Sequence, residues 1–273
     1  MIELLPISKT IPKDDILRCV NYNANDLVFT SGSLIEGIGN EKSDLDIFVV
    51  VADFARLKTD STITYDNDSF KVAFTNINGI GGDIEYWSLS SLESLIDQLN
   101  SIDFTDTTKR SLSQLKVGKS DFETLASFLH RFINSKCVFN SDLYNNYYKK
   151  LNLNNYFSLM TRYYVNMVDN SYEDITGNLQ KGELETALII SRNTLIKATA
   201  AYIFSKHESV DRDKWVYIKL KALSKENLEV LEVLNKFNDL YFSRSTTSKL
   251  ELERLVEDYV LFINKIIKLC GKL

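Results

Sequence analysis

Cysteine, proline and glycine are scarce in this sequence, and each scarcity excludes a class of protein. The 273 residues include 3 Cys, 2 Pro and 10 Gly. The cysteines, Cys19, Cys137 and Cys270, lie far apart and are odd in number, which gives neither a disulfide framework nor a zinc site. So little Pro and Gly leaves little room for long linkers, and both prolines, Pro6 and Pro12, lie near the start. The composition indicates a folded chain in a reducing compartment.

Long apolar runs and an excess of basic residues are also missing. No apolar run reaches the ~20 residues that a membrane span needs, and Met1 is not followed by the basic segment of a signal peptide. The sequence therefore predicts a cytoplasmic protein without a membrane partner. The formal net charge is -5 at pH 7, with 32 basic and 37 acidic side chains. Because contacts to a phosphate backbone need a basic surface, a nucleic-acid partner is not expected.

What the sequence does contain is a Gly-Ser pair followed by two aspartates at the start of an apolar run. Gly32 and Ser33 lie at a turn, where backbone N–H groups can face an anion. Asp44 and Asp46 precede residues 47–51, which are apolar throughout, as in a buried strand. Side chains two residues apart in a strand point to the same face. Two such carboxylates are able to hold one or two Mg²⁺ ions that bridge to substrate phosphates.

A second pair of carboxylates follows at the same spacing. Asp83 and Glu85 lie in the segment Gly82-Asp83-Ile84-Glu85-Tyr86-Trp87, which has the alternation of a strand. Asp83 comes directly after two glycines, whereas Glu85 is flanked by apolar residues. Either residue is a candidate for a third metal ligand, and the other for a general base or a solvated charge at the strand end. The sequence leaves this choice open.

On these residues the chain resembles the DNA polymerase beta-like nucleotidyltransferase superfamily. Its signature is a Gly-Ser pair, then Asp-x-Asp before a strand, and a third carboxylate from a neighbouring strand. Kanamycin-type relatives use a glutamate in that third place, and minimal nucleotidyltransferases use an aspartate. The resemblance implies a nucleoside triphosphate as co-substrate, with ATP expected, and two Mg²⁺ ions. The catalytic and metal-binding residues that it implies are Asp44, Asp46, Asp83 and Glu85, with Gly32 and Ser33 at the triphosphate.

The loop between the Gly-Ser pair and the aspartates departs from that pattern. Many members of the superfamily carry an arginine there, but this chain has Glu36 and Asn40 in the loop. The positive charge that balances a triphosphate must then come from elsewhere. The candidates that we consider are Arg192, Lys197, Lys214 and Lys219, all from the helical second half. His130, beside an apolar helical stripe, is interpreted as a packed histidine on a helix face.

The chain changes character near residue 105. Before that point, strand-like runs alternate with turns, at residues 26–30, 45–51, 69–75 and 83–87, and Ser88 caps the start of a helix. Beyond about residue 120, apolar residues recur at helical spacing, at 122–132, 184–202, 228–237 and 252–267. We therefore predict an α+β fold, with a small mixed-sheet nucleotidyltransferase domain at residues 1–105. An α-helical bundle at residues 106–273 would bind the substrate.

This layout also resembles the small-molecule nucleotidyltransferases, such as the kanamycin and lincosamide enzymes. The resemblance implies transfer of a nucleoside monophosphate to a hydroxyl of a small molecule, such as an antibiotic or metabolite, with release of pyrophosphate. Glu185 and Arg192, two turns apart on one helix face, are candidates for lining the acceptor site. The alternatives are a protein AMPylator of a toxin–antitoxin system and a non-catalytic nucleotide-binding module. The sequence does not specify the acceptor, the base or the oligomeric state.

Overall fold

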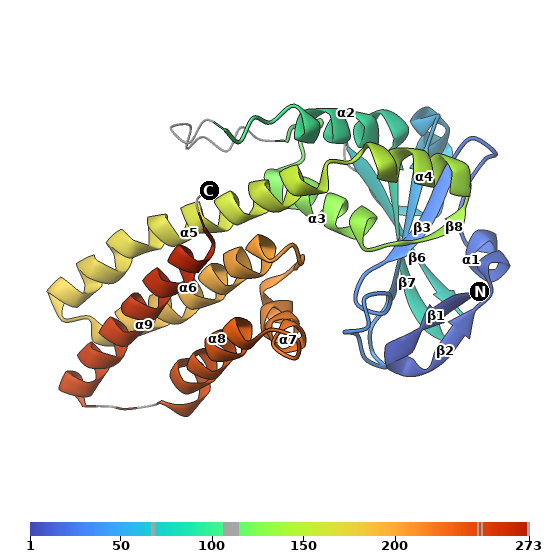
Figure 1. Ribbon diagram of the computed structural model, residues 1–273. Coiled ribbons are helices and arrows are strands. Elements are labelled where there is room, and N and C mark those ends of the chain that lie inside the picture. The colour runs from blue at the N-terminus through green and yellow to red at the C-terminus, as the bar shows by residue number, and fades with distance from the viewer. Residues whose placement is uncertain (67–68, 106–114, 245, 247, 272–273) are drawn as a thin grey trace. The chain divides into compact units, whose positions relative to one another are not determined.

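The computed structural model describes residues 1–66, 69–105, 115–244, 246 and 248–271. The chain divides into two compact units (Figure 1). The first unit consists of Met1–Ile102 and Ser113–Asn152, and the second of Asp103–Leu112 and Leu153–Leu273. A mixed sheet followed by a helical region confirms the predicted α+β class. Among the described residues, no helix combines the length and the apolar character needed to cross a membrane.

The first unit is built on a six-stranded mixed sheet with the order β5-β6-β7-β4-β3-β8. The central strands β4 and β7 are parallel, and the other neighbours are antiparallel. The strands are β3 (Leu27–Ser31), β4 (Leu45–Val51), β5 (Ile63–Asp66), β6 (Phe70–Ile77), β7 (Ile80–Ser88) and β8 (Lys136–Phe139). A separate two-stranded sheet pairs β1 (Ile2–Leu4) with β2 (Lys9–Ile11).

The sheet is covered on both faces, which explains why β4 is apolar at almost every position. On one face, Ile47 and Val49 pack in a cluster with residues of the N-terminal segment, among them Leu4 and Ile16. Ile16 belongs to the short helix α1 (Lys13–Arg18). The first unit also contains the 3₁₀ turns η1 (Leu5–Ile7) and η2 (Phe54–Thr59).

Aromatic side chains fill the space over the opposite face. Phe128 of α3 (Phe122–Ile133) stacks on Trp87 of β7, with ring centroids 4.2 Å apart, and contacts Phe48 of β4 at 6.1 Å. Phe29 of β3 stacks on Phe48 at 5.0 Å. These rings are almost fully buried, so α3 is held firmly on the central strands. Two further helices of the unit are α2 (Leu89–Asn100), capped by Ser88 as predicted, and α4 (Ser141–Lys150).

The end of the first unit differs from the predicted boundary at residue 105. α3, β8 and α4 follow that residue in sequence but belong to the first unit, which runs to Asn152. β8 pairs with β3, where Thr30 is the register partner of Lys136. A strand of four residues has no periodicity of its own, and its partner lies about a hundred residues earlier. The predicted helical bundle at residues 106–273 therefore does not account for β8, which is a strand of the sheet.

The second unit is helical in its described residues. Its elements are α5 (Leu153–Lys181), α6 (Leu184–Ser205), α7 (Asp213–Leu223), α8 (Leu228–Asn238), the π turn η3 (Asp239–Ser243) and α9 (Lys249–Leu269). Tyr164 of α5 stacks on Phe204 of α6, with centroids 5.6 Å apart. The hydroxyl of Tyr259 on α9 donates a hydrogen bond to the carbonyl of Leu240. Buried aromatic residues thus join consecutive elements, α5 to α6 and η3 to α9.

Candidate active site

The Gly-Ser turn and the second aspartate meet at one end of the sheet. β3 ends at Ser31, whose register partner on β4 is Asp46. Gly32 follows with φ of 84°, and its carbonyl accepts hydrogen bonds from the amides of Ile35 and Glu36. A Cβ atom placed on Gly32 would lie only 1.6 Å from Oδ2 of Asp46. The Asp46 carboxylate therefore lies directly against the backbone of the turn.

The first aspartate lies against a second glycine. Asp44 is exposed and lies just ahead of β4. Its Oδ1 is only 2.1 Å from the position that a Cβ atom of Gly81 would occupy. Gly81 is the first of the two glycines before Asp83, and it belongs to β7. A Cβ atom at either glycine would therefore overlap a carboxylate oxygen, so a substitution there would displace that Asp side chain. Each aspartate thus packs its carboxylate closely against the backbone of a glycine.

The second pair of carboxylates lies on the same face of the sheet as Asp46. In the parallel pairing of β4 with β7, Asp46 is the register partner of Asp83, and Phe48 is the partner of Glu85. Alternation along the strands then points Asp46, Asp83 and Glu85 toward the face that α3 covers. Glu85 is held within this face, because Trp87 Nε1 donates a hydrogen bond to its Oε2 at 3.0 Å. Asp83 is the nearer of the two to Asp46 in register.

A cation that the sequence analysis missed also contacts this group. Arg131 of α3 forms an ion pair with Asp46, with 2.8 Å between Nη1 and Oδ1. Its guanidinium lies over the ring of Phe48, at 5.8 Å from the centroid, and the residue is only 7% exposed. The signal in the sequence was a basic residue between apolar ones, in Leu129-His130-Arg131-Phe132. Its partner lies far away in sequence, so the run alone did not reveal its role.

The residue before Arg131 ties the same helix to the turn. Nε2 of His130 lies 3.0 Å from Oε1 of Glu36, and both side chains are nearly buried. Asn134 Nδ2 lies 3.4 Å from the other ring nitrogen of His130. His130 is packed, as expected, but the sequence did not predict its pairing with Glu36. Two consecutive residues of α3 therefore contact the turn and the aspartate strand.

The donor set suits a magnesium ion in its chemistry. Carboxylate oxygens are the ligands that Mg²⁺ prefers, and the Asp44 and Asp46 carboxylates lie against two glycines at the end of the sheet. In the part of the chain that the structure describes, no three His, Cys, Asp or Glu side chains are gathered closely enough to hold a metal. Asp46 pairs instead with Arg131. The residue types fit the predicted ion, and the ion itself stays a prediction.

The basic residues predicted to bind phosphate lie in the second unit. Arg192 belongs to α6, and Lys214 and Lys219 belong to α7. Lys219 pairs with Glu208 at 2.9 Å. Lys214 lies over the Trp215 ring, at 4.7 Å from its centroid. Lys214 and Lys219 thus have contacts within their own unit, and a role of all three residues at the triphosphate stays a prediction.

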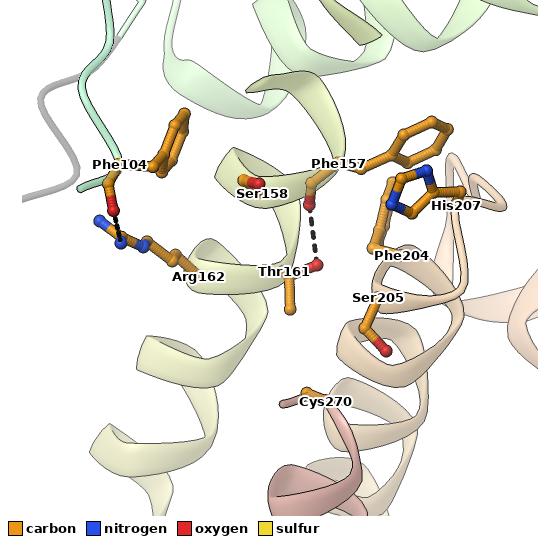
Figure 2. Close-up of a pocket in the computed structure, with 9 residues that line it drawn as sticks. All are labelled: Phe104, Phe157, Ser158, Thr161, Arg162, Phe204, Ser205, His207 and Cys270. Carbon is orange, nitrogen blue, oxygen red and sulfur yellow. Dashed lines mark hydrogen bonds between the residues drawn. The ribbon is translucent and has the colours of Figure 1, made fainter. Parts of the chain in front are cut away.

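The second unit contains a pocket of about 240 Å³ (Figure 2). On one side, Arg162 donates a hydrogen bond to the carbonyl of Phe104, and on the other the ring of Phe157 stacks on His207. Burial raises the pKa of the Cys270 thiol to about 11, so this cysteine is not a nucleophile at neutral pH. The remaining lining residues are Ser158, Thr161, Phe204 and Ser205. Hydroxyls, aromatic rings and one guanidinium suit a small polar ligand.

Comparison with known proteins adds a likeness in structure only. Neither the known protein families nor the curated proteins give a match to this sequence. Among solved structures, the chain is similar to a nucleotidyltransferase-like protein from Exiguobacterium sibiricum 255-15, with 10% identical residues and a TM-score of 0.49. The similar region covers 93% of this chain and 71% of that protein.

Proposed function

We propose that the first unit binds a nucleoside triphosphate with Mg²⁺ and transfers its nucleoside monophosphate to a hydroxyl acceptor. One observation carries the proposal: the Gly-Ser turn, Asp46 and Asp44 are packed together at one end of the sheet. Gly32 leaves room for Asp46, and Gly81 leaves room for Asp44. One glycine lies in the turn and the other in β7, and each is packed against an acidic side chain. The arrangement instead suits a site where carboxylates and backbone amides share one ligand.

Each residue has a role in this proposal. Asp44, Asp46 and Asp83 would hold the metal, since Asp83 is the register partner of Asp46. The backbone amides after Gly32 would face the β- and γ-phosphates. Glu85, positioned by Trp87, would accept a proton from the acceptor hydroxyl. The metal, when bound, would neutralise charge on the triphosphate and favour in-line attack on the α-phosphorus.

The proposed acceptor is a small hydroxylated molecule of the kanamycin or lincosamide type. The net charge of -5 supports a small acceptor over a polynucleotide. The second unit also offers a pocket with hydroxyls and a guanidinium. The proposed contribution of Glu185 and Arg192 to acceptor binding rests on their shared face of α6.

A second candidate function, binding of a nucleotide without transfer, is favoured by one observation. Asp46, the central carboxylate, is ion-paired with a buried arginine. If Arg131 never leaves Asp46, the metal loses a ligand, and the unit would bind a nucleotide without chemistry. The two functions differ in whether pyrophosphate is released.

The test is to incubate the protein with each labelled triphosphate and Mg²⁺, together with a panel of hydroxylated metabolites and antibiotics. Label in a small soluble product, with release of pyrophosphate, is the expected result. Label on a protein would assign the chain to AMPylation, binding without turnover would leave the non-catalytic function, and absence of binding would refute the proposal.

Substitution of the central carboxylate gives the first prediction. Asp46→Asn should lower transfer by at least about a thousandfold, because one lost metal ligand costs several kcal/mol of transition-state stabilisation. Asp97→Asn, which makes the same change on the exposed surface of α2, is the matched control and should leave turnover unchanged. Transfer at the wild-type rate by Asp46→Asn would refute the assigned role.

A further inference from the structure

We propose that Arg131 supplies the cation that the Gly-Ser loop lacks, by pairing with Asp46 in the ligand-free protein and with the triphosphate in the bound one. Residues 32–43 contain one basic side chain, the exposed Lys42. Arg131 reaches the same end of the sheet from α3. The inference rests on the proposed function and names a further positioning residue for it.

The backbone of Arg131 is fixed. Phe128, one turn earlier on α3, stacks on Trp87, and Phe132, the next residue, packs edge-on against Phe29 at 5.4 Å. His130, on the other side, is paired with Glu36. The backbone of α3 is therefore anchored at three neighbouring positions, while an arginine side chain has several rotatable bonds. Its guanidinium is able to change partners without any movement of the helix.

The charge around Arg131 gives the reason for an exchange. Asp46 lies beside Asp83 in register, and like charges at that spacing repel each other when no cation is present. A guanidinium relieves this repulsion in the empty site. A divalent ion on the same carboxylates relieves it more strongly, and the guanidinium is then repelled by the metal. The nearest anion that matches its planar fork of N–H groups would be the bound phosphate chain.

A purely structural ion pair predicts a different pattern. If Arg131 only fastens α3 to β4, its loss would lower the stability of the first unit. The binding of metal and of nucleotide would then both weaken, or neither would change. An exchanging arginine competes with the metal and cooperates with the nucleotide. Its removal must therefore strengthen metal binding and weaken nucleotide binding in the same variant. Opposite changes in the two affinities distinguish an exchanging arginine from a structural ion pair.

The test uses Mn²⁺ as the metal probe, without nucleotide, and Mg²⁺ with ATP as the nucleotide probe. In Arg131→Gln, Mn²⁺ should bind about tenfold more tightly than to the wild type, and ATP with Mg²⁺ should bind about tenfold or more weakly. Arg131→Lys keeps the charge without the fork and should weaken ATP binding less. Arg18→Gln makes the same charge change at an exposed position of α1 and should alter neither affinity.

Other results would overturn the inference or pass the decision to Arg131→Lys. If both affinities of Arg131→Gln are unchanged, or both fall, the arginine is structural and the inference is wrong. If Arg131→Gln does not fold, Arg131→Lys decides: weaker ATP binding at an unchanged melting temperature supports the inference, and unchanged ATP binding overturns it. If the wild type binds no triphosphate, the proposed function itself fails, and the inference fails with it.

Discussion

At the scale of single residues, two glycines determine where the acidic side chains lie. Gly32 and Gly81 differ in conformation, because only Gly32 has a positive φ. They share a close approach to a carboxylate, of Asp46 and Asp44 respectively. A glycine at a turn usually serves the backbone alone. Here the missing Cβ atoms also provide the space that two functional side chains occupy.

The second prediction concerns Gly32. Gly32→Ala should displace the Asp46 carboxylate, because the new methyl group would overlap Oδ2, and triphosphate binding should fall at least about tenfold. Gly37→Ala is the matched control, since Gly37 has a similar φ of 80° but nothing within 4 Å of the added atom. Both variants carry the backbone strain, and only Gly32→Ala carries the collision. Equal ATP affinities in the two variants, measured by calorimetry, would count against the assigned site.

The sequence predicts those site residues whose pattern lies within one short segment of the chain. Asp44, Asp46 and the Gly-Ser pair are recognisable because their order and spacing lie within one short segment. The shared face of Asp83 and Glu85 follows from alternation along one strand. Arg131 is not recognisable in this way, because only the docking of α3 brings it to Asp46.

At the scale of elements, hydrogen bonds to one carboxylate join α6 to α8. The Tyr202 hydroxyl donates to Oε1 of Glu229 at 2.6 Å, and Nζ of Lys206 lies 2.9 Å from the same oxygen. The hydrogen bond from Tyr202, followed by that from Lys206, lowers the pKa of Glu229 below its ordinary value of 4.5. A depressed carboxyl pKa contributes stability above the ordinary value, and this contribution is lost as the pH falls through the folded value.

The third prediction follows from this pH dependence of the stability contributed by Glu229. Glu229→Gln should lower the melting temperature of the second unit near pH 7, where the wild type keeps the charge, and the difference should shrink as the pH falls below 4.5. The effect should be small, since the carboxylate is well exposed to solvent. Glu226→Gln, at an exposed neighbouring position, should show no such dependence. Melting curves from pH 7 to about pH 3 test this, and a constant difference across that range would contradict it.

Elements with a strong periodic pattern were predictable, and short ones were not. β4 matches the predicted strand at residues 45–51, and α2 begins after the predicted Ser88 cap. β8 escaped prediction because it is stabilised by pairing with β3 rather than by its own pattern. The contact of Gly81 with Asp44 was not predicted, because a glycine in a strand that lies against a carboxylate looks the same in the sequence as a glycine in a turn.

At the scale of the whole molecule, the sheet unit is completed by residues that follow the strands by a long stretch of sequence. α3 covers the aromatic face, and β8 completes the edge beside β3. Without them, Phe29, Phe48 and Trp87, each nearly fully buried, would be exposed. Full exposure of one such ring costs about 1.5–3 kcal/mol.

The fourth prediction tests this boundary. A fragment of residues 1–152 should unfold cooperatively on heating, because it contains the whole of the first unit, Met1–Ile102 and Ser113–Asn152. A fragment of residues 1–105 should show no cooperative transition, because it lacks α3 and β8. Calorimetry and near-ultraviolet circular dichroism measure both properties. A cooperative transition in the shorter fragment would restore the boundary at residue 105.

The late position of β8 also affects the order in which the protein folds during its synthesis. Lys136 follows its partner Thr30 by 106 residues, which a ribosome adds in about 5 to 20 s. During that interval the nascent sheet exposes the free edge of β3, and unpaired strand edges are prone to aggregate. Before α3 has been synthesised, the aromatic face of the sheet is uncovered as well. We therefore expect the emerging chain to depend on a chaperone until α3 and β8 have left the ribosome.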